Sequence, residues 1–299
     1  MLRNFTTEAL TEIVKYLEAE LARSQVVSIS VPHPDIGKGQ YSGEWVAGVK
    51  HRSLRVWLDL AEQFKCRLLL PDKLSANTVK LTFEKLRAQS WLRNVPLSKT
   101  EKYGLASGYA RIHKLEEASF LLTFLEALRR IDLKPGARIL SLGVNTGEEL
   151  KALEAAYKEP LTVVGIDHSA SAVAKARDYF ANYSFIEADI NRLETLGLEP
   201  FDLILSLGTL QSPSIDDRTL LRYLVQNLLK EKGSVCVAWP NSHYQDGELL
   251  YGARTKNFRQ PELSLVIKDI AFYKKYLQQH GFKVHITGKY YLFVTALKQ

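Results

Sequence analysis

Short apolar runs alternate with amphipathic stretches through the second half of the chain. A short apolar run bounded by turn residues indicates a buried strand, and a 3.6-residue apolar repeat indicates a helix. After a first strand that begins at Ala137, further strands are predicted at 161–166, 183–187, 201–207 and 233–239. Helices are predicted near 147–157, 170–181 and 218–230. Strands separated by helical segments are typical of a parallel, doubly wound sheet.

The C-terminal part departs from this alternation. A helix is predicted near 268–280, followed by strands at 282–287 and 290–297 that only Gly288 and Lys289 separate. Two strands joined by so short a turn form a hairpin. We therefore expect an α/β fold in which a mostly parallel, seven-stranded sheet ends in an antiparallel hairpin.

The N-terminal part has its own set of elements. An apolar stripe predicts a helix over 7–21 with Thr7 as its N-cap, and alternation predicts a strand over 26–31 that stops at Pro32. A further helix near 54–64 and strands near 66–70 and 79–83 follow. We predict a small α/β appendage over 1–90 that is either a substrate-side or a lid domain, a linker over 91–114 and the main domain over 115–299.

Composition narrows the class of protein. The chain has 299 residues, of which 46% are hydrophobic, so it can bury a substantial core. No apolar run approaches the length of a membrane span, and no charged and then apolar leader opens the chain. We therefore predict a cytoplasmic protein with no membrane partner. Cys66 and Cys236 lie in apolar runs, which favours reduced core thiols and no metal site. The oligomeric state stays open.

The net charge of +7 is unevenly distributed along the chain. Residues 1–130 contain 20 Lys and Arg against 14 Asp and Glu, whereas residues 131–299 contain 20 against 19. Such an excess can attract an acidic acceptor or a nucleic acid, although a shallow excess is more often solvated surface.

The strongest chemical signal lies between Ala137 and Leu150. Here a short apolar strand enters a turn that contains Gly143 and Gly147 and then an amphipathic helix. Such a turn is expected to expose unpaired backbone N–H groups to a ligand. The next strand ends at Asp167, whose carboxylate can accept hydrogen bonds from ribose hydroxyls. The two units together predict a nucleotide site.

These motifs resemble the class I AdoMet-dependent methyltransferases over roughly residues 115–299. The family's first motif is similar to Leu-Asp-Leu-Gly-x-Gly-x-Gly, and Leu140 to Gly147 reads Leu-Ser-Leu-Gly-Val-Asn-Thr-Gly. Ser141 therefore replaces an acid and Asn145 a glycine, although Asn tolerates positive φ. The resemblance implies S-adenosyl-L-methionine (AdoMet) as cofactor. The residues that it assigns to the cofactor are Ser141, Gly143, Asn145, Gly147, Asp167, His168, Asp189, Ile190 and Leu207.

The acceptor side carries weaker signals. Methyltransferases that act on the amino groups of bases often have Asn/Asp-Pro-Pro-Tyr after the fourth strand, whereas this chain has Leu207-Gly-Thr-Leu-Gln-Ser-Pro213. His243 and Tyr244 follow the fifth strand and are candidate catalytic residues, with His243 as a general base or simply a surface histidine. The basic residues Arg254, Lys256 and Arg259 in the insertion 245–268 are expected to close over an acidic acceptor.

The sequence therefore predicts direct in-line methyl transfer to a small or acidic acceptor. One alternative is an RNA methyltransferase that uses basic residues before the main domain. Those residues are Lys50, Arg52, Arg55, Lys99, Lys102, Arg111 and Lys114. A non-catalytic AdoMet-binding module also remains open. A nicotinamide-dependent oxidoreductase shares Asp167 but lacks the Gly-x-Gly-x-x-Gly turn.

Overall fold

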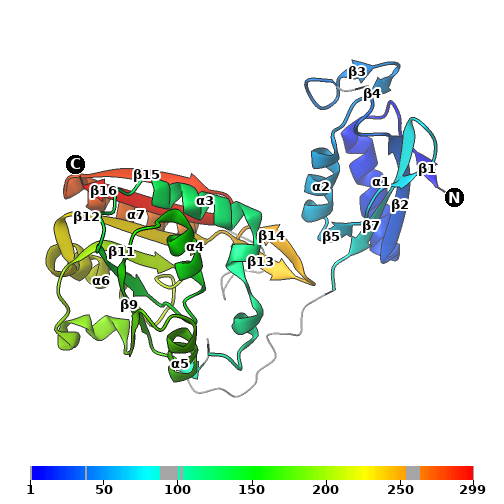
Figure 1. Cartoon of the computed structure of the whole chain (residues 1–299). Coiled ribbons are helices and arrows are strands. Elements are labelled where there is room, and N and C mark those ends of the chain that lie inside the picture. Colours follow the sequence, from blue (N-terminus) through cyan, green and yellow to red (C-terminus); the bar gives the residue numbers. More distant parts are fainter. Residues whose placement is uncertain (1, 38, 88–99, 102–103, 254–262, 299) are drawn as a thin grey trace. The chain divides into compact units, whose positions relative to one another are not determined.

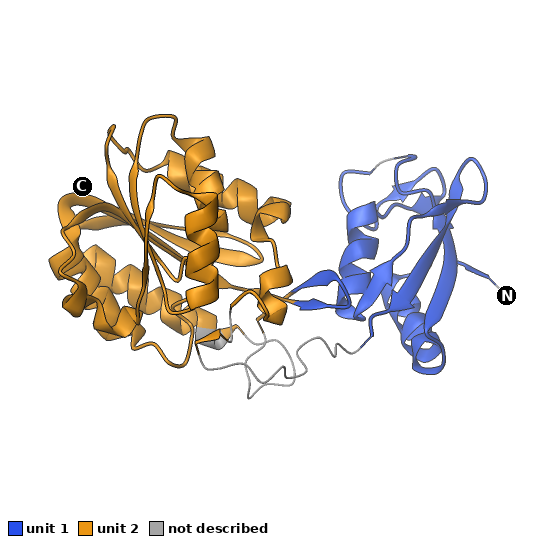
Figure 2. Ribbon diagram, turned by 60° about the horizontal axis from the view of Figure 1, so that its bottom comes forward, with its two compact units in different colours: residues 1–89, 244–250 blue, residues 90–243, 251–299 orange. Residues whose placement is uncertain are grey.

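The computed structural model describes residues 2–37, 39–87, 100–101, 104–253 and 263–298. The chain folds into two compact units (Figure 2). The first comprises Met1–Gln89 and Tyr244–Leu250, and the second Ser90–His243 and Tyr251–Gln299. A short part of the predicted main domain, including Tyr244, thus groups with the N-terminal unit, and the predicted linker groups with the second unit.

The second unit is built on a seven-stranded sheet of order β10-β9-β8-β11-β12-β16-β15 (Figure 1). Its strands are β8 Arg138–Leu142, β9 Thr162–Asp167, β10 Ser184–Glu187, β11 Phe201–Leu207, β12 Leu229–Pro240, β15 Phe282–Gly288 and β16 Tyr291–Lys298. The first five are parallel, and β16 is antiparallel to both of its neighbours. The predicted parallel sheet with a terminal antiparallel hairpin is confirmed.

Helices cover both faces of this sheet. One layer contains α3 Ala118–Arg129, α4 Glu148–Ala156 and α5 Ala170–Tyr179. The other contains α6 Asp217–Tyr223, a π-helical turn Leu224–Leu228, α7 Ser264–Gln279 and the 3₁₀ segment η4 Ile190–Leu196. Successive strand residues point to opposite faces, so Leu203 and Leu205 pack against the first layer and Ile204 against the second.

Two local features differ from the sequence prediction. The helix expected over 218–230 ends at Tyr223 and the π-helical turn, because β12 begins at Leu229, where it pairs with Phe201. The segment after β12 forms a hairpin of β13 Ser242–Gln245 and β14 Glu248–Tyr251. Its turn, Asp246-Gly247, has positive φ at both residues. Asp-Gly is a strong signal for such a turn.

The first unit packs two helices against a small sheet. Its strands are β1 Arg3–Asn4, β2 Val26–Pro32, β5 Cys66–Leu68, β6 Asp72–Lys73 and β7 Thr78–Lys85, with a separate pair of β3 Trp45–Val46 and β4 Val49–Lys50. Helices α1 Leu10–Arg23 and α2 Leu54–Gln63 contribute Ile13, Leu17 and Trp57 to its core.

The predicted N-cap of the first helix is wrong. The cap position of α1 is Ala9, and Thr7 lies outside the helix. The Glu8 carboxylate instead accepts hydrogen bonds from the backbone N–H groups of Thr6 and Thr7. An acidic side chain thus organises this helix entry.

Both cysteines are buried free thiols, as predicted. Burial raises the pKa of Cys66 to about 11 and that of Cys236 to about 12, so both stay protonated near neutral pH. Across the part of the chain that the structure describes, no helix has the length and apolar character needed to cross a membrane.

Candidate functional site

The carboxyl ends of β8 and β9 bring the first predicted motif together. Strand β8 ends at Leu142, and the turn 143–147 leads into α4. Gly143, Asn145 and Gly147 all have positive φ, at 67°, 48° and 75°. Asn145 thus adopts the left-handed conformation expected for a residue in place of glycine. A Cβ at Gly143 would also overlap Thr209, which lies beyond β11.

The N–H groups of this turn are not exposed donors, contrary to the expectation from the sequence. Gly143 and Val144 donate to the Ile166 carbonyl, at 2.8 and 3.1 Å, and Gly147 donates to the Val144 carbonyl. The remaining two, from Asn145 and Thr146, bond to the side chains of Asp167 and Asn145. The physical reason is that a turn this tight folds back onto β9, where acceptors of the protein itself pair with its N–H donors.

Asp167 holds the turn and the start of α5 together. Its side chain is 6% exposed; Oδ2 accepts the Asn145 N–H and Oδ1 the Ser169 N–H, both at 2.9 Å. A carboxylate oxygen has lone pairs for more than one hydrogen bond, so both can still accept a ligand hydroxyl. Nδ1 of the predicted His168 lies 4.0 Å from Oδ1 of Asp167. The structure thus gathers Asn145, Asp167 and His168 at one place.

A second carboxylate contacts Ser141, the position at which the family's first motif has its acid. Oγ of Ser141, which is 1% exposed at the end of β8, donates to Oε1 of Glu149 at 2.9 Å. Glu149 lies in the first turn of α4. Glu149 is not among the residues predicted from the sequence, although an acid two residues after Gly147, in a chain with Ser at 141, is a usable signal.

Burial raises the pKa of Glu149 to about 7. The backbone N–H of Glu149 itself, the Lys114 ammonium and the Ser141 hydroxyl act in the opposite direction, and the Asp167 charge adds to the rise. Lys114 donates to the Leu207 carbonyl at 3.1 Å, and its Nζ lies 5.3 Å from the centre of the Tyr291 ring. Lys114 therefore contacts the last residue of β11, Leu207, and also acts electrostatically on Glu149.

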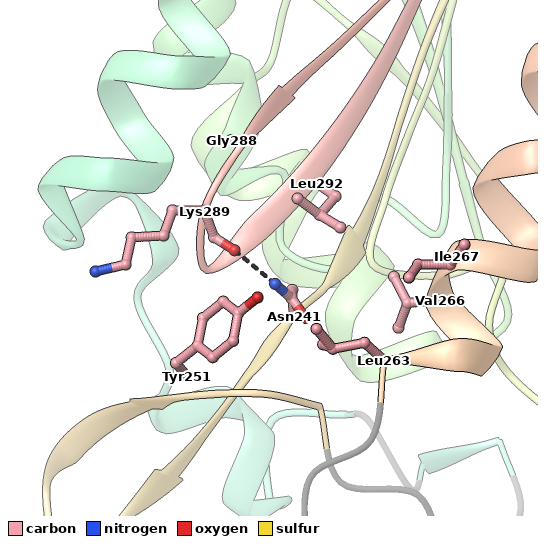
Figure 3. Close-up of a pocket in the computed structure, with 8 residues that line it drawn as sticks. All are labelled: Asn241, Tyr251, Leu263, Val266, Ile267, Gly288, Lys289 and Leu292. Atoms are coloured by element: carbon pink, nitrogen blue, oxygen red, sulfur yellow. Dashed lines mark hydrogen bonds between the residues drawn. The ribbon is translucent and has the colours of Figure 1, made fainter. Parts of the chain in front are cut away.

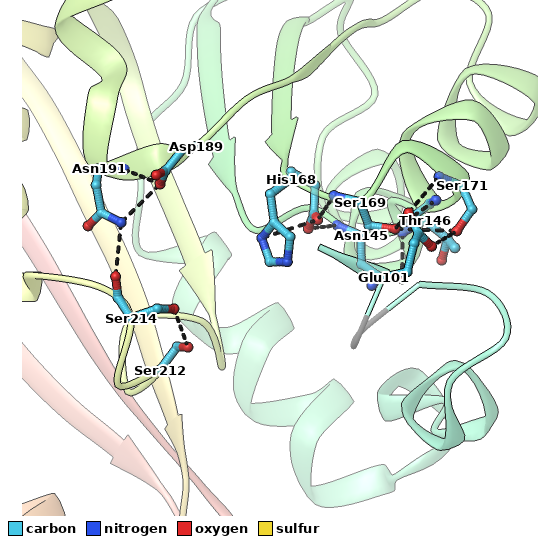
Figure 4. Close-up of polar contacts among 12 residues, drawn as sticks. Glu101, Asn145, Thr146, His168, Ser169, Ser171, Asp189, Asn191, Ser212 and Ser214 are labelled. Atoms are coloured by element: carbon cyan, nitrogen blue, oxygen red, sulfur yellow. Dashed lines mark hydrogen bonds and ion pairs between the residues drawn. The ribbon is translucent and has the colours of Figure 1, made fainter. Parts of the chain in front are cut away.

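The segment before α3 contacts the starts of α4 and α5 at the same sheet edge (Figure 4). It contains 3₁₀ turns η2 Gly108–Arg111 and η3 Lys114–Glu116. The Glu101 carboxylate accepts hydrogen bonds from the Ser169 hydroxyl, at 3.0 Å, and from the Ser171 hydroxyl at the start of α5. These bonds hold the pKa of Glu101 below its ordinary value. His113 also contacts Glu148 of α4 at 3.1 Å.

The predicted third motif lies after β10. Oδ1 of Asp189 accepts hydrogen bonds from the backbone and side-chain N–H groups of Asn191, both at 2.9 Å (Figure 4). Asp189 thus caps η4, and Ile190 is 7% exposed in the core. Their contact with a cofactor stays a prediction.

The two predicted catalytic residues fall in different units. His243 belongs to the second unit and Tyr244 to the first. Nδ1 of His243 lies 2.6 Å from the Gly252 carbonyl oxygen. A carbonyl only accepts, so Nδ1 carries the proton and Nε2 keeps the lone pair in the neutral ring. Catalysis by either residue stays a prediction, and Arg254, Lys256 and Arg259 lie outside the described residues.

Comparison with known families identifies the class of protein. The family model described as "Methyltransferase domain" matches residues 133–282, just over half of the chain. The chain belongs to this family, and it is a class I methyltransferase that uses AdoMet. A search of curated proteins found no match.

Several solved structures are similar to this chain. One is a Haloferax volcanii methyltransferase in complex with its Trm112 activator, at 16% identity, 67% coverage of this chain, 98% of the other and a TM-score of 0.47. A SAM-dependent methyltransferase from Aquifex aeolicus is 17% identical, with 64% of this chain and 96% of the other covered and a TM-score of 0.47. The magnesium protoporphyrin IX methyltransferase of Synechocystis, with bound SAM, is 14% identical, with 69% of this chain and 100% of the other covered and a TM-score of 0.45. Similarities this low do not identify an acceptor.

The charges of the site suit AdoMet better than a dinucleotide. AdoMet has no phosphate, carries a cationic sulfonium and an ammonium group, and exposes two ribose hydroxyls. A pyrophosphate needs free N–H donors at the strand-to-helix turn, and here all of those donors from 143 to 147 are used. Carboxylates border the turn instead, at Glu149 and Asp167.

Proposed function

We propose that the two carboxylates beside the turn and Lys114 hold AdoMet by its polar groups. Asp167 accepts the ribose hydroxyls, and the pair of Ser141 and Glu149 takes the methionine ammonium. Lys114, which lies within electrostatic reach of Glu149, takes the methionine carboxylate. Asp189 and Ile190 flank the adenine. In this arrangement the positive ammonium of the methionine part lies against Glu149, and its negative carboxylate lies against Lys114.

Bound AdoMet supplies an electrophilic methyl group. Transfer from a sulfonium is an in-line displacement, so the protein mainly positions the donor and the nucleophile and excludes water. In our proposal Nε2 of His243 accepts a proton from acceptors that must lose one. Its hydrogen bond to the Gly252 carbonyl supports this role by fixing the tautomer.

We further propose a small-molecule acceptor. The supporting observation is the charge pairing on the first unit, where basic side chains contact acids. Arg55 pairs with Asp59, Lys80 with Asp72, and Arg67 with both Glu84 and Glu248. An RNA-binding face needs unpaired positive charge along a backbone track. Each of these pairs leaves less free positive charge for such a track.

One feature favours RNA as the second candidate. The Trp45 ring is 64% exposed, the Lys50 ammonium lies 5.5 Å from its centre, and Tyr41 is 71% exposed nearby in the sequence. Exposed aromatic rings beside a cation can stack on single-stranded bases. Lys99 and Lys102, which the RNA hypothesis also invoked, lie outside the described residues.

A salt titration separates the two candidates. Binding of total cellular RNA is measured on filters from 50 to 300 mM salt, beside transfer of labelled methyl groups to a size-fractionated extract. We expect label in the small-molecule fraction and weak RNA binding. Tight RNA binding that falls by about one log unit per log unit of salt for each phosphate contact, with label in RNA, would contradict the small acceptor. The cytoplasmic location stays a prediction.

A further inference from the structure

A pocket of about 290 Å³ lies at the far end of the same sheet edge, entirely within the second unit (Figure 3). Its walls are mostly apolar and come from the start of α7 and from β16. The wall residues are Leu263, Val266, Ile267 and Leu292, with Tyr251 at one side and Asn241 at the base. A pocket of this size is large enough for a small molecule.

Among the described residues that line this pocket, Asn241 is the polar residue that is buried, whereas Tyr251 and Lys289 are exposed. Its side chain is 2% exposed, and Nδ2 donates to the Lys289 carbonyl at 2.9 Å (Figure 3). That carbonyl can only accept, so the amide orientation is fixed and Oδ1 points elsewhere. Within the described residues Oδ1 has no hydrogen-bond partner. A buried acceptor without a donor is unfavourable, and a ligand N–H or O–H would relieve it.

The rest of Asn241 is held rigidly. Its backbone N–H donates to the Tyr290 carbonyl at 2.8 Å, and its carbonyl accepts the Gly252 N–H at 2.9 Å. The residue follows β12 directly, two strands along the sheet from β8. Neighbouring strands are about 4.8 Å apart, so the two positions on the edge are separated by about 10 Å.

We propose that this pocket binds the methyl acceptor, and that the acceptor is a small, largely apolar molecule that donates an N–H or O–H hydrogen bond to Oδ1 of Asn241. The assignment of the ligand as methyl acceptor rests on the proposed function. The existence of the binding site rests only on the apolar walls and the buried Oδ1. The two parts can therefore be tested separately.

The binding test uses indole and benzofuran, which have nearly the same shape but differ in the N–H donor. The full-length protein with labelled Ile, Leu and Val methyl groups reports binding directly, because the four wall residues carry methyl groups. We expect indole to shift these four signals saturably and to bind about threefold to tenfold more tightly than benzofuran. No shift at these methyls, or equal binding of the two probes, would overturn the site.

The variant Ile267→Lys places a charge in the apolar wall at a residue that is 60% exposed, so folding should tolerate it. Leu122→Lys, on α3 at 63% exposure, is the matched control. We expect Ile267→Lys alone to weaken indole binding at least tenfold and to reduce labelled methyl transfer to small molecules at least tenfold. Normal transfer by Ile267→Lys would overturn the acceptor assignment.

Calorimetry with AdoMet on the same samples distinguishes the two failures. If AdoMet binds normally and indole does not reach the pocket, the pocket inference fails and the proposed cofactor site stands. If AdoMet does not bind to the unmodified protein, the proposed cofactor site fails whatever indole does. Calorimetry should show equal AdoMet affinity for Ile267→Lys and Leu122→Lys, because neither residue is part of the proposed cofactor site.

Discussion

The two halves of the carboxyl edge of the sheet differ in which of their polar groups have hydrogen-bond partners. Beside β8 and β9 every turn N–H from 143 to 147 has a partner, and the groups left to meet a ligand are carboxylates. Beside β12 and β16 the pocket is apolar, and a buried amide oxygen, Oδ1 of Asn241, lacks a partner among the described residues.

The difference suggests how each half selects its ligand. In the cofactor half, internal hydrogen bonds hold the turn in shape before any ligand arrives, and negative charge favours a cation over a phosphate. In the other half, our proposal is that apolar walls provide affinity and that one unsatisfied acceptor provides direction.

Gly143→Ala should disrupt the preorganised turn most strongly. The new Cβ would be strained at φ 67° and would overlap Thr209. We expect a loss of about 2–4 kcal/mol of unfolding free energy, measured by chemical denaturation, and AdoMet binding reduced more than tenfold. Gly136→Ala is the control, because φ is 76° there but nothing lies within 4 Å of the new Cβ. Equal losses in both variants would show that overlap with Thr209 is unimportant.

Asp167→Ala should weaken AdoMet binding at least tenfold, measured by calorimetry. The change removes the acceptor of two ribose hydroxyls in our proposal, and hydrogen bonds to a charged group are each worth about 1.5–3 kcal/mol. It also leaves the N–H groups of Asn145 and Ser169 without their carboxylate. Asp178→Ala, an exposed aspartate of α5, should bind AdoMet normally. Unchanged affinity in a folded Asp167→Ala protein would rule out the assignment.

Glu149 should make both stability and cofactor binding depend on pH. Its folded-state pKa of about 7 lies above its ordinary value of 4.5, so the folded protein holds the proton more tightly. Stability from this group is therefore present at low pH and falls as the pH rises from about 4.5 to 7. A cationic ligand favours the ionised form, so AdoMet affinity should rise up to about tenfold between pH 6 and 8.

Glu149→Gln should abolish both effects, because the amide does not titrate. Thermal denaturation and AdoMet calorimetry across pH 5 to 8 measure them, in buffers of different ionisation enthalpy so that proton release on binding is detected. A variant that kept the pH dependence of the unmodified protein would assign it to another group.

Glu101→Ala should have the smallest effect. It releases the segment before α3 from the hydroxyls of Ser169 and Ser171 at the start of α5. We expect AdoMet to dissociate about threefold faster in stopped-flow displacement, with little change in stability, since this is a partly exposed contact. Glu116→Ala, which alters an exposed acid of the same segment, serves as the control. Identical dissociation rates would show that the segment does not retain the cofactor.

Much of the fold followed from the sequence because its signals are local. The alternation of apolar runs and helical stripes specified the sheet strands, and the Gly288-Lys289 pair specified the terminal hairpin. Asn145 was correctly expected to adopt positive φ. The N-cap prediction failed at Thr7, because the helix begins only at Leu10 and no side chain caps its first turn. The Glu8 carboxylate instead accepts from the N–H groups of Thr6 and Thr7, before the helix.

By itself, the sequence determined the class of protein and the order of its cofactor motifs, since these depend on residue type and spacing along the chain. Only the tertiary structure decided which polar groups remain available. It paired the turn N–H groups with β9, brought Glu149 to Ser141, and placed Lys114 at the end of β11. It also left Oδ1 of Asn241 buried without a partner among the described residues, at a pocket lined by side chains from α7 and β16. These facts depend on segments far apart in the sequence, and no local pattern records which donor reaches which acceptor.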